Sequence, residues 1–136
     1  EANAGWTSAH KLSGVAYLAI KLKWDTDVFS GVPDITALVT GRKVYDPRSP
    51  SAAAAFSNNP ALCIRDYLTN NRYGKGLASS KIDDVAFSAA ATDCDQSVLY
   101  YTNGTTGKIF ETNAVLQTDE TLFENLQKIQ LYNLFY

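Results

Sequence analysis

The first third of the chain alternates hydrophobic and polar residues, which is the pattern of a β-strand with one buried face. Lys21 and Lys23 fall on one side of residues 14–24. The other side is apolar and consists of Ala16, Leu18, Ile20, Leu22 and Trp24. This alternation predicts a half-buried strand over residues 14–24. Residues 35–40 and 43–45 form two further apolar runs, and together they predict an antiparallel hairpin.

Apolar residues recur at helical spacing in the middle of the chain. Asn59 followed by Pro60 predicts the cap and the first position of a helix. Its expected apolar stripe consists of Leu62, Cys63, Tyr67 and Leu68. The turn-forming residues 73–76 are expected to stop this helix. Residues 46–50 before it are expected to form a loop, because each of their two prolines lacks a backbone donor.

Two more helices are predicted. The first of them is expected to start at Ser80, where Asp83 completes an acidic variant of the capping box. Its expected inward face consists of Ile82, Val85, Ala86, Ala89 and Ala90. The last helix is expected from about Asp119 to Leu131, with acidic residues in its first turn. Its expected inward face consists of Leu122, Phe123, Leu126 and Ile129.

Residues 98–102 and 108–116 predict a second hairpin, joined by the turn-forming residues 103–107. The resulting order is strand, hairpin, two helices, hairpin and helix. This order predicts an α+β fold, with antiparallel strands and about three helices, and not a βαβ repeat. With 136 residues, of which 46% are hydrophobic, the chain can bury a core. Residues 1–136 are therefore expected to form a single domain, or a fragment of a larger multidomain protein.

Charge is nearly balanced along the chain, with 12 basic and 14 acidic residues and a net charge of -2. Binding to a nucleic-acid backbone needs a basic stripe, which this distribution does not provide. No apolar run approaches the roughly 20 residues needed to cross a bilayer, so no membrane span is expected. The sequence contains no methionine, and we interpret it as part of a longer chain.

Candidate catalytic groups are few, and each has a simpler explanation. The single histidine, His10, lies in a polar stretch and is expected to be a surface residue. Asp83 and Asp84 fall in the opening turn of a predicted helix, where negative charge opposes the helix dipole. Asp93 and Asp95 fall at the turn after that helix and lack the spacing of a calcium loop. The sequence therefore predicts no enzyme active site.

Cofactor and metal sites are also not expected. Cys63 and Cys94 lie 31 positions apart, and we interpret them as buried free thiols, with a disulfide between them as an alternative. Two cysteines cannot supply the four ligands of a zinc or iron–sulfur site. Residues 104–108 are too short for a phosphate loop. Asn103 begins a glycosylation pattern, which carries no weight without evidence of secretion.

Two groups of residues are candidates for contact with another subunit or partner. Positive charge is concentrated between residues 42 and 75, and arginine forks such as those of Arg42 and Arg48 suit carboxylates across an interface. The second group is the apolar run at the end of the sequence. It consists of Leu131, Tyr132, Leu134, Phe135 and Tyr136. These five large side chains are expected to need a covering surface.

Several blocks of the sequence, in the same order, resemble the tail tip attachment family of long-tailed bacteriophages, also called host-specificity protein J. The blocks are residues 6–18, beginning Trp6-Thr7-Ser8-Ala9-His10, residues 31–36, 41–48 and 59–70, the Tyr73-Gly74 stop, and residues 82–95. The resemblance covers roughly residues 6 to 129, although no block alone is a functional signature. Members of that family continue past the third helix into further strands.

The resemblance implies a baseplate hub protein that forms a homotrimer and closes the distal end of the tail tube. It also implies support of host attachment and DNA ejection, and contact with other tail tip and tail tube proteins. Phage DNA would meet such a protein only by passing through the tail lumen. The expected location is the distal end of the tail in the virion. The family supplies no catalytic, cofactor or metal residues for these blocks, so none is transferred.

Two other functions stay open at this point. One is a tail-associated enzyme domain that degrades cell walls, which is disfavoured by the single histidine and by carboxylates with local explanations. The other is a module that binds a surface sugar, which could use Trp6, Trp24 and the eight tyrosines. Most of those aromatic residues occupy strand or helix positions where core packing accounts for them.

Overall fold

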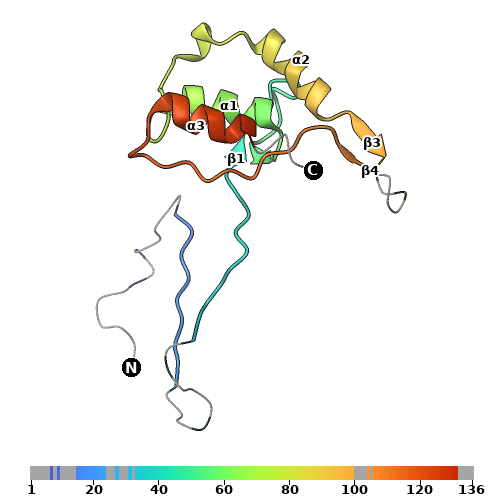
Figure 1. Ribbon diagram of the computed structural model, residues 1–136. Helices are drawn as coiled ribbons and strands as arrows, with labels where there is room; N and C mark the ends of the chain where they lie inside the picture. Colours follow the sequence, from blue (N-terminus) through green and yellow to red (C-terminus); the bar gives the residue numbers. More distant parts are fainter. Residues whose placement is uncertain are drawn as a thin grey trace. The chain divides into compact units, whose positions relative to one another are not determined.

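The computed structural model describes residues 7, 9, 15–23, 27, 31, 33–99, 104 and 106–131. Contacts between residues divide the chain into two units, Glu1–Val39 and Thr40–Tyr136. In the part of the chain that is described, the helices and strands all belong to the second unit (Figure 1). They are three α-helices, one short 3-10 helix and two small antiparallel sheets, which confirms the predicted α+β class.

Helix α1 (Pro60–Thr69) forms where the sequence predicts it, because its first turn is capped locally. The Asn59 side chain accepts hydrogen bonds from the backbone N–H groups of Ala61 and Leu62, at 3.0 and 3.4 Å. Pro60 occupies the first turn, where its missing donor has no cost. The helix ends at Thr69, a few residues before the predicted stop, because Asn70 is extended and its amide caps the last turn through Asp66 O.

Helix α2 (Asp84–Cys94) differs from the prediction in its start and in its buried face. Residues Ser79–Lys81 form the separate 3-10 helix η1, and Asp83 is itself the N-cap of α2. The predicted inward face is wrong, since Val85 is 82% exposed and Ala86, Ala89 and Ala90 are exposed. The face that turns to the core consists of Phe87, Ala91 and Cys94. Alanines occur on more than one face of this helix, so the sequence pattern alone could not show which face is buried.

The first sheet pairs β1 (Lys43–Val44) with β2 (Ala55–Phe56) in antiparallel register. The predicted hairpin between residues 35–40 and 43–45 is therefore wrong, and residues 33–42 contain no strand. The predicted loop after β1 supplies the turn instead. Ser49 N donates to Asp46 O at 3.1 Å and Ala52 N donates to Ser49 O at 2.9 Å, so two successive turns reverse the chain.

The second hairpin is confirmed, although its strands are shorter than predicted. Strand β3 (Ser97–Leu99) pairs with β4 (Thr106–Lys108), with Val98 opposite Gly107. Gly104 lies in the turn with a φ of 71°, a conformation that favours glycine. Residues 109–116 are not strand; Thr112 N donates to Asn58 O at 2.7 Å and ties this segment to the residue before the α1 cap.

Helix α3 (Leu122–Leu131) begins with a capping box that the sequence analysis did not identify. Thr121 N donates to Glu124 Oε2 at 2.8 Å, and Glu124 N donates to Thr121 Oγ1 at 3.3 Å. Ile129 is buried as predicted, whereas Phe123 is 67% exposed, contrary to the prediction. Asn125, a polar residue, takes a buried position on this helix.

The core of the second unit is built around α1, which packs against α2, α3 and β1 (Figure 1). Its central cluster consists of Val44, Ala61, Leu62 and Ala91, with Phe87 and Cys94 packed against it. Tyr67 and Ile129 are also buried. The small side chains of Ala61 and Ala91 leave room for α1 and α2 to approach closely. This core positions the elements that carry the ion network and the cleft of the second unit.

The first unit contains extended segments over residues 15–23 and 33–39, without assigned strand. The predicted half-buried strand is therefore wrong for residues 15–23, because both of its faces are exposed. Tyr17 and Leu18, on opposite faces of the alternating pattern, are 58% and 62% exposed. An alternating sequence forms a strand only when a partner strand and a covering layer are present.

Candidate functional site

An ion network joins three elements of the second unit. Arg48 Nη2 lies 2.8 Å from Asp46 Oδ2 and 2.8 Å from Asp95 Oδ2, and Lys108 Nζ lies 2.7 Å from Asp95 Oδ1. The network connects the turn after β1 with the end of α2 and with β4. Arg48, one of the predicted interface residues, thus uses its charge within the chain.

The carboxylates of this network are stabilised in their ionised form. Hydrogen bonding from Arg48 lowers the pKa of Asp46. Burial raises the pKa of Asp95, but hydrogen bonds from Lys108, Arg48 and Asn59 outweigh it and the net shift is downward. A general acid at neutral pH needs a raised pKa, whereas the pKa values of Asp46 and Asp95 are both lowered. The two carboxylates therefore have the properties of structural ion-pair partners that hold the turn, α2 and β4 together.

The other predicted carboxylates also have structural partners. Asp83 accepts from Val85 N and Ala86 N as the N-cap of α2. Asp84 accepts two hydrogen bonds from Arg65, at 2.7 and 3.0 Å, which lower its pKa. The prediction that Asp83 and Asp84 open this helix is confirmed. The prediction that the other pair follows the helix holds only for Asp95, its C-cap, because Asp93 lies in the last turn of α2.

Arg42, the second predicted interface arginine, keeps more of its surface free. Its side chain is 56% exposed, and its Nε lies 3.7 Å from Asp66 Oδ2. The guanidinium also lies over the ring of Tyr73, at 5.1 Å from the ring centre. The Tyr73 hydroxyl donates to Asp66, and burial together with this bond raises the pKa of Tyr73. Arg42 and Tyr73 therefore stabilise each other's positions near the end of α1.

The two cysteines are free thiols on helices α1 and α2, and both are partly buried. Cys63 Sγ donates to Ser57 O at 3.5 Å. Burial and the charge of Asp66 raise the pKa of Cys63 to about 11. Burial also raises the pKa of Cys94. At neutral pH both are protonated thiols, which are poor nucleophiles.

Several predicted residues lie outside the described part of the chain: His10, Trp6, Trp24, Asn103 and residues 132–136. Leu131 ends α3, and its side chain is also outside the description. Among the described residues, no group of three or more His, Cys, Asp or Glu side chains could hold a metal ion. None of the helices described is long and apolar enough to cross a membrane.

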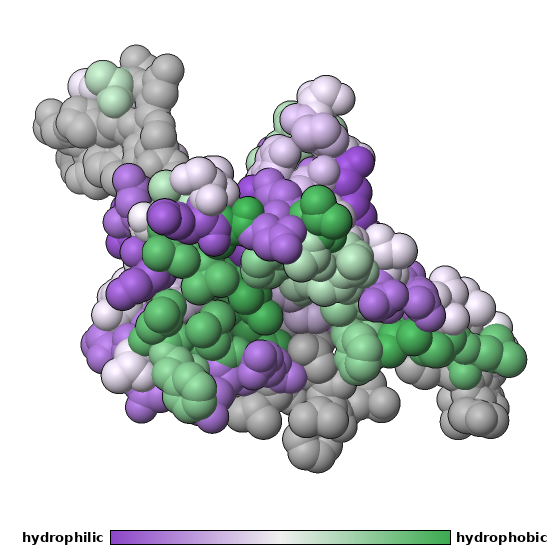
Figure 2. Space-filling view, turned by 90° about the horizontal axis from the view of Figure 1, so that it is seen from above, coloured by the Kyte–Doolittle hydropathy of each residue, from purple (hydrophilic) through white to green (hydrophobic). Residues whose placement is uncertain are grey.

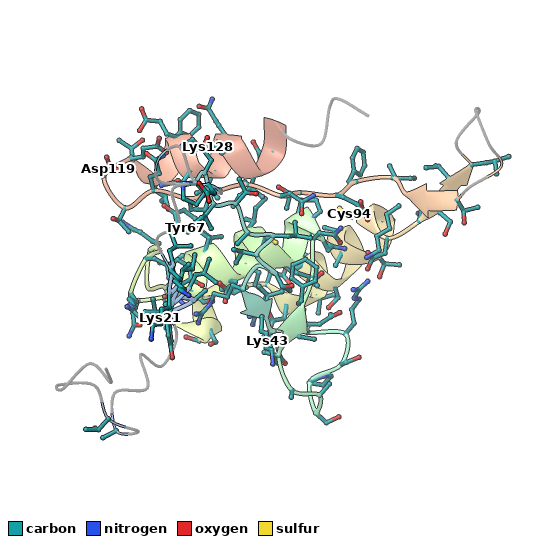
Figure 3. The ribbon with its side chains drawn as sticks, turned by 90° about the horizontal axis from the view of Figure 1, so that it is seen from below. Lys21, Lys43, Tyr67, Cys94, Asp119 and Lys128 are labelled. Atoms are coloured by element: carbon teal, nitrogen blue, oxygen red, sulfur yellow. The ribbon has the colours of Figure 1, made fainter. Side chains whose placement is uncertain are left out.

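A surface cleft of about 260 Å³ lies between the loop that follows α1 and the segment that precedes α3. Its lining includes Tyr67, Arg72, Tyr73, Lys75, Gln117 and Glu120. Figure 3 shows Tyr67 on α1 and Lys128 on the neighbouring helix α3. Sequence reasoning missed this cleft, since its two walls are more than forty residues apart in the chain.

Exposed apolar side chains form the other candidate surface. In the first unit, eight large hydrophobic residues are between 46% and 104% exposed: Val15, Tyr17, Leu18, Ile20, Leu22, Ile35, Leu38 and Val39. In the second unit, hydrophobic residues also lie exposed along the β3–β4 hairpin and just after it (Figure 2). Leu99 in β3 is 65% exposed, and Phe110, two residues after β4, is 41% exposed.

Comparison with known proteins shows similarity to a phage structural protein. No protein-family profile matches the chain. The chain is 28% identical over 141 aligned positions to baseplate hub protein pb3 of Escherichia phage T5, an alignment that covers 91% of this chain. It spans 15% of the length of that relative. Over most of its length, the chain is thus similar to a short part of a phage baseplate hub protein.

Proposed function

We propose that this chain is a structural part of a phage tail tip, within a baseplate hub that closes the distal end of the tail tube. In this role it supports host attachment and DNA ejection and does not catalyse a reaction. The observation that carries the proposal is the similarity to baseplate hub protein pb3 over 91% of the chain. The finer assignment to the tail tip attachment family rests on the sequence blocks described above.

The exposed apolar segments support an assembly role. Leu38 is 104% exposed and Leu18 is 62% exposed in the chain alone. Fully burying one large apolar side chain contributes about 1.5 to 3 kcal/mol, so a neighbouring protein that covers these segments would gain substantially. An extended segment also offers its backbone for pairing with a strand of another chain.

We further propose that the hub is a homotrimer, in which contacts between unlike surfaces repeat around a threefold axis. Of the two predicted interface arginines, Arg42 has the more exposed side chain, at 56%. The other predicted members of the same interface are Leu131, Tyr132, Leu134, Phe135 and Tyr136. Light scattering on the full-length protein tests this proposal; a trimer is expected, and a monomer would contradict it.

The location can be tested on intact particles. Gold-labelled antibodies raised against residues 40–136 are expected to decorate the distal end of the tail in electron micrographs. Decoration of the head, or of released protein only, would overturn the assignment.

The contact surface can be tested with matched variants. Leu38→Lys is expected to reduce incorporation of the protein into tails at least tenfold, because it places a charge on the apolar segment. Ser51→Lys makes the same charge change at an exposed position of the β1–β2 turn, and it is expected to leave incorporation unchanged. Equal incorporation of both variants would remove the first unit from the interface.

The enzyme alternative predicts a different result. Incubation of the protein with peptidoglycan and with assorted glycans is expected to release no soluble fragments. Release that is abolished by Asp83→Asn or Asp95→Asn would reverse the assignment.

A further inference from the structure

The loop that forms one wall of the cleft has a fixed backbone. Lys75 N donates to Tyr67 O at 3.0 Å, and Gly76 N donates to Asn70 O at 2.9 Å. The Asn70 side chain accepts from Arg72 N at 2.9 Å. A Cβ atom at position 74 would lie 1.8 Å from Tyr67 O, so only glycine allows the loop to fold this closely onto α1.

The opposite wall is fixed by a buried amide of α3. Asn125 is 1% exposed, and its side chain pairs with the backbone of Gln117 in both directions. Gln117 N donates to Asn125 Oδ1 at 3.1 Å, and Asn125 Nδ2 donates to Gln117 O at 2.7 Å. These two hydrogen bonds explain why α3 buries a polar residue at position 125, because Asn125 holds the segment at Gln117 in place as a wall of the cleft.

The charges of the cleft do not cancel. Glu120 is neutralised by an ion pair with Lys128 on α3. Arg72 and Lys75 are exposed, and neither side chain has an ionic partner among the described residues. The cleft thus presents two uncompensated cations on a fixed loop, which suits an anionic ligand.

The walls favour a peptide over a sugar. Tyr67 is 4% exposed, and the ring of Tyr73 is covered by Arg42 at 5.1 Å. Tyr67 is too buried, and one face of the Tyr73 ring is taken by Arg42, so little aromatic surface is left on which a sugar could pack its apolar side. The remaining polar groups, on Gln117 and Thr118, can hydrogen-bond to backbone amides.

We propose that this cleft binds a carboxylate-rich polypeptide segment of a neighbouring protein. The inference deepens the proposed function, since it assigns a partner contact within the assembly. Arg72 and Lys75 hold the carboxylates, and Gln117 and Thr118 contact the backbone of the segment.

Binding of fluorescein-labelled hexaglutamate to the 136-residue chain, followed by fluorescence anisotropy in about 20 mM salt where charge interactions are weakly screened, tests the proposal. Saturable binding is expected. Arg72→Gln and Lys75→Gln are each expected to weaken binding about three- to fivefold, as an exposed ion pair would, and the double variant about tenfold. Thr118→Glu, which adds a carboxylate inside the cleft, is expected to weaken binding by a similar factor.

The matched control is Lys43→Gln combined with Lys81→Gln, which removes two exposed lysines outside the cleft. It makes the same change in net charge and is expected to leave binding within twofold. Equal weakening by both double variants would show attraction to overall charge and would overturn the site. Absence of saturable binding would also overturn it.

A carboxylated glycan distinguishes the source of the carboxylate. Hyaluronate oligosaccharides carry the same charged group, and tighter binding of these than of hexaglutamate would overturn the peptide assignment. The result is independent of particle location, because the isolated chain is used. Failure of peptide binding with antibody decoration at the tail tip would leave the proposed function intact.

Discussion

Leu62 in α1 is 2% exposed, whereas Leu38 in the first unit is 104% exposed. Both lie among other apolar residues in the sequence, and the difference in exposure comes from what surrounds them in the structure. Leu62 belongs to helix α1, which is capped by Asn59 and packs against helix α2 and strand β1. Leu38 lies in an extended segment without assigned strand. Hydrophobic residues thus form a core only where they lie on elements that pack against one another.

The largest expected effect sharpens this comparison directly. Leu62→Ala is expected to lower the free energy of unfolding by about 3 kcal/mol, since it removes a buried side chain and leaves a cavity. Leu38→Ala is expected to change it by less than about 0.5 kcal/mol. Urea unfolding of the 136-residue chain, followed by far-UV circular dichroism, measures both. Equal losses would mean that the first unit has a core of its own.

The second prediction concerns the cap that begins α1. Asn59 is fully buried, and its Nδ2 donates to Ala91 O of α2 at 2.8 Å while its Oδ1 caps α1. Asn59→Ala removes a cap and leaves a buried carbonyl without its donor, so a loss of about 2 kcal/mol is expected. Asn113→Ala, at an exposed position, is the control and should change urea unfolding little. Similar losses in both variants would contradict the cross-helix role.

The third prediction is a pH dependence that belongs to the second unit. The Arg65 guanidinium lowers the pKa of Asp84 below its ordinary 3.8. The unfolded chain therefore takes up this proton first as the pH falls. The contribution of Asp84 is fully present above about pH 5 and is lost as the pH falls through its folded-state pKa.

Asp84→Asn is expected to remove that part of the acid destabilisation. Because the Asp84 side chain is 43% exposed, the effect is screened and amounts to about 1 kcal/mol. Urea unfolding at a series of pH values measures it. The control, Asp34→Asn, makes the same substitution at an exposed position of the first unit. An unchanged profile for Asp84→Asn would contradict the assignment.

The smallest predicted effect compares two glycines. Gly76 has a φ of 69°, and Gly31 in the first unit has open space where a Cβ would lie. Gly76→Ala is expected to destabilise the chain by about 1 kcal/mol, because alanine is strained in the left-handed region. Gly31→Ala is expected to be neutral or slightly stabilising. Thermal unfolding of the two variants measures the difference, and a tolerated Gly76→Ala would show that the cleft loop can relax.

The sequence by itself determined the features that depend on hydrogen bonds between near neighbours. Asn59 and Pro60 placed the start of α1, and the turn around Gly104 placed the second hairpin. The acidic residues near α2 were assigned to its ends for the same reason. Such interactions span two to four residues, so their signal is fully contained in a short stretch of sequence.

Only the tertiary structure decided which partners these elements take. Lys43–Val44 pairs with Ala55–Phe56 and not with the preceding apolar run, and α2 buries Ala91 instead of Val85. The cleft brings the loop after Tyr67 to the segment at Gln117. Each of these outcomes depends on how much apolar surface an element buries against segments that are distant in the sequence. The pattern of one segment gives that segment's periodicity, but it contains no information on which of several apolar surfaces will cover it.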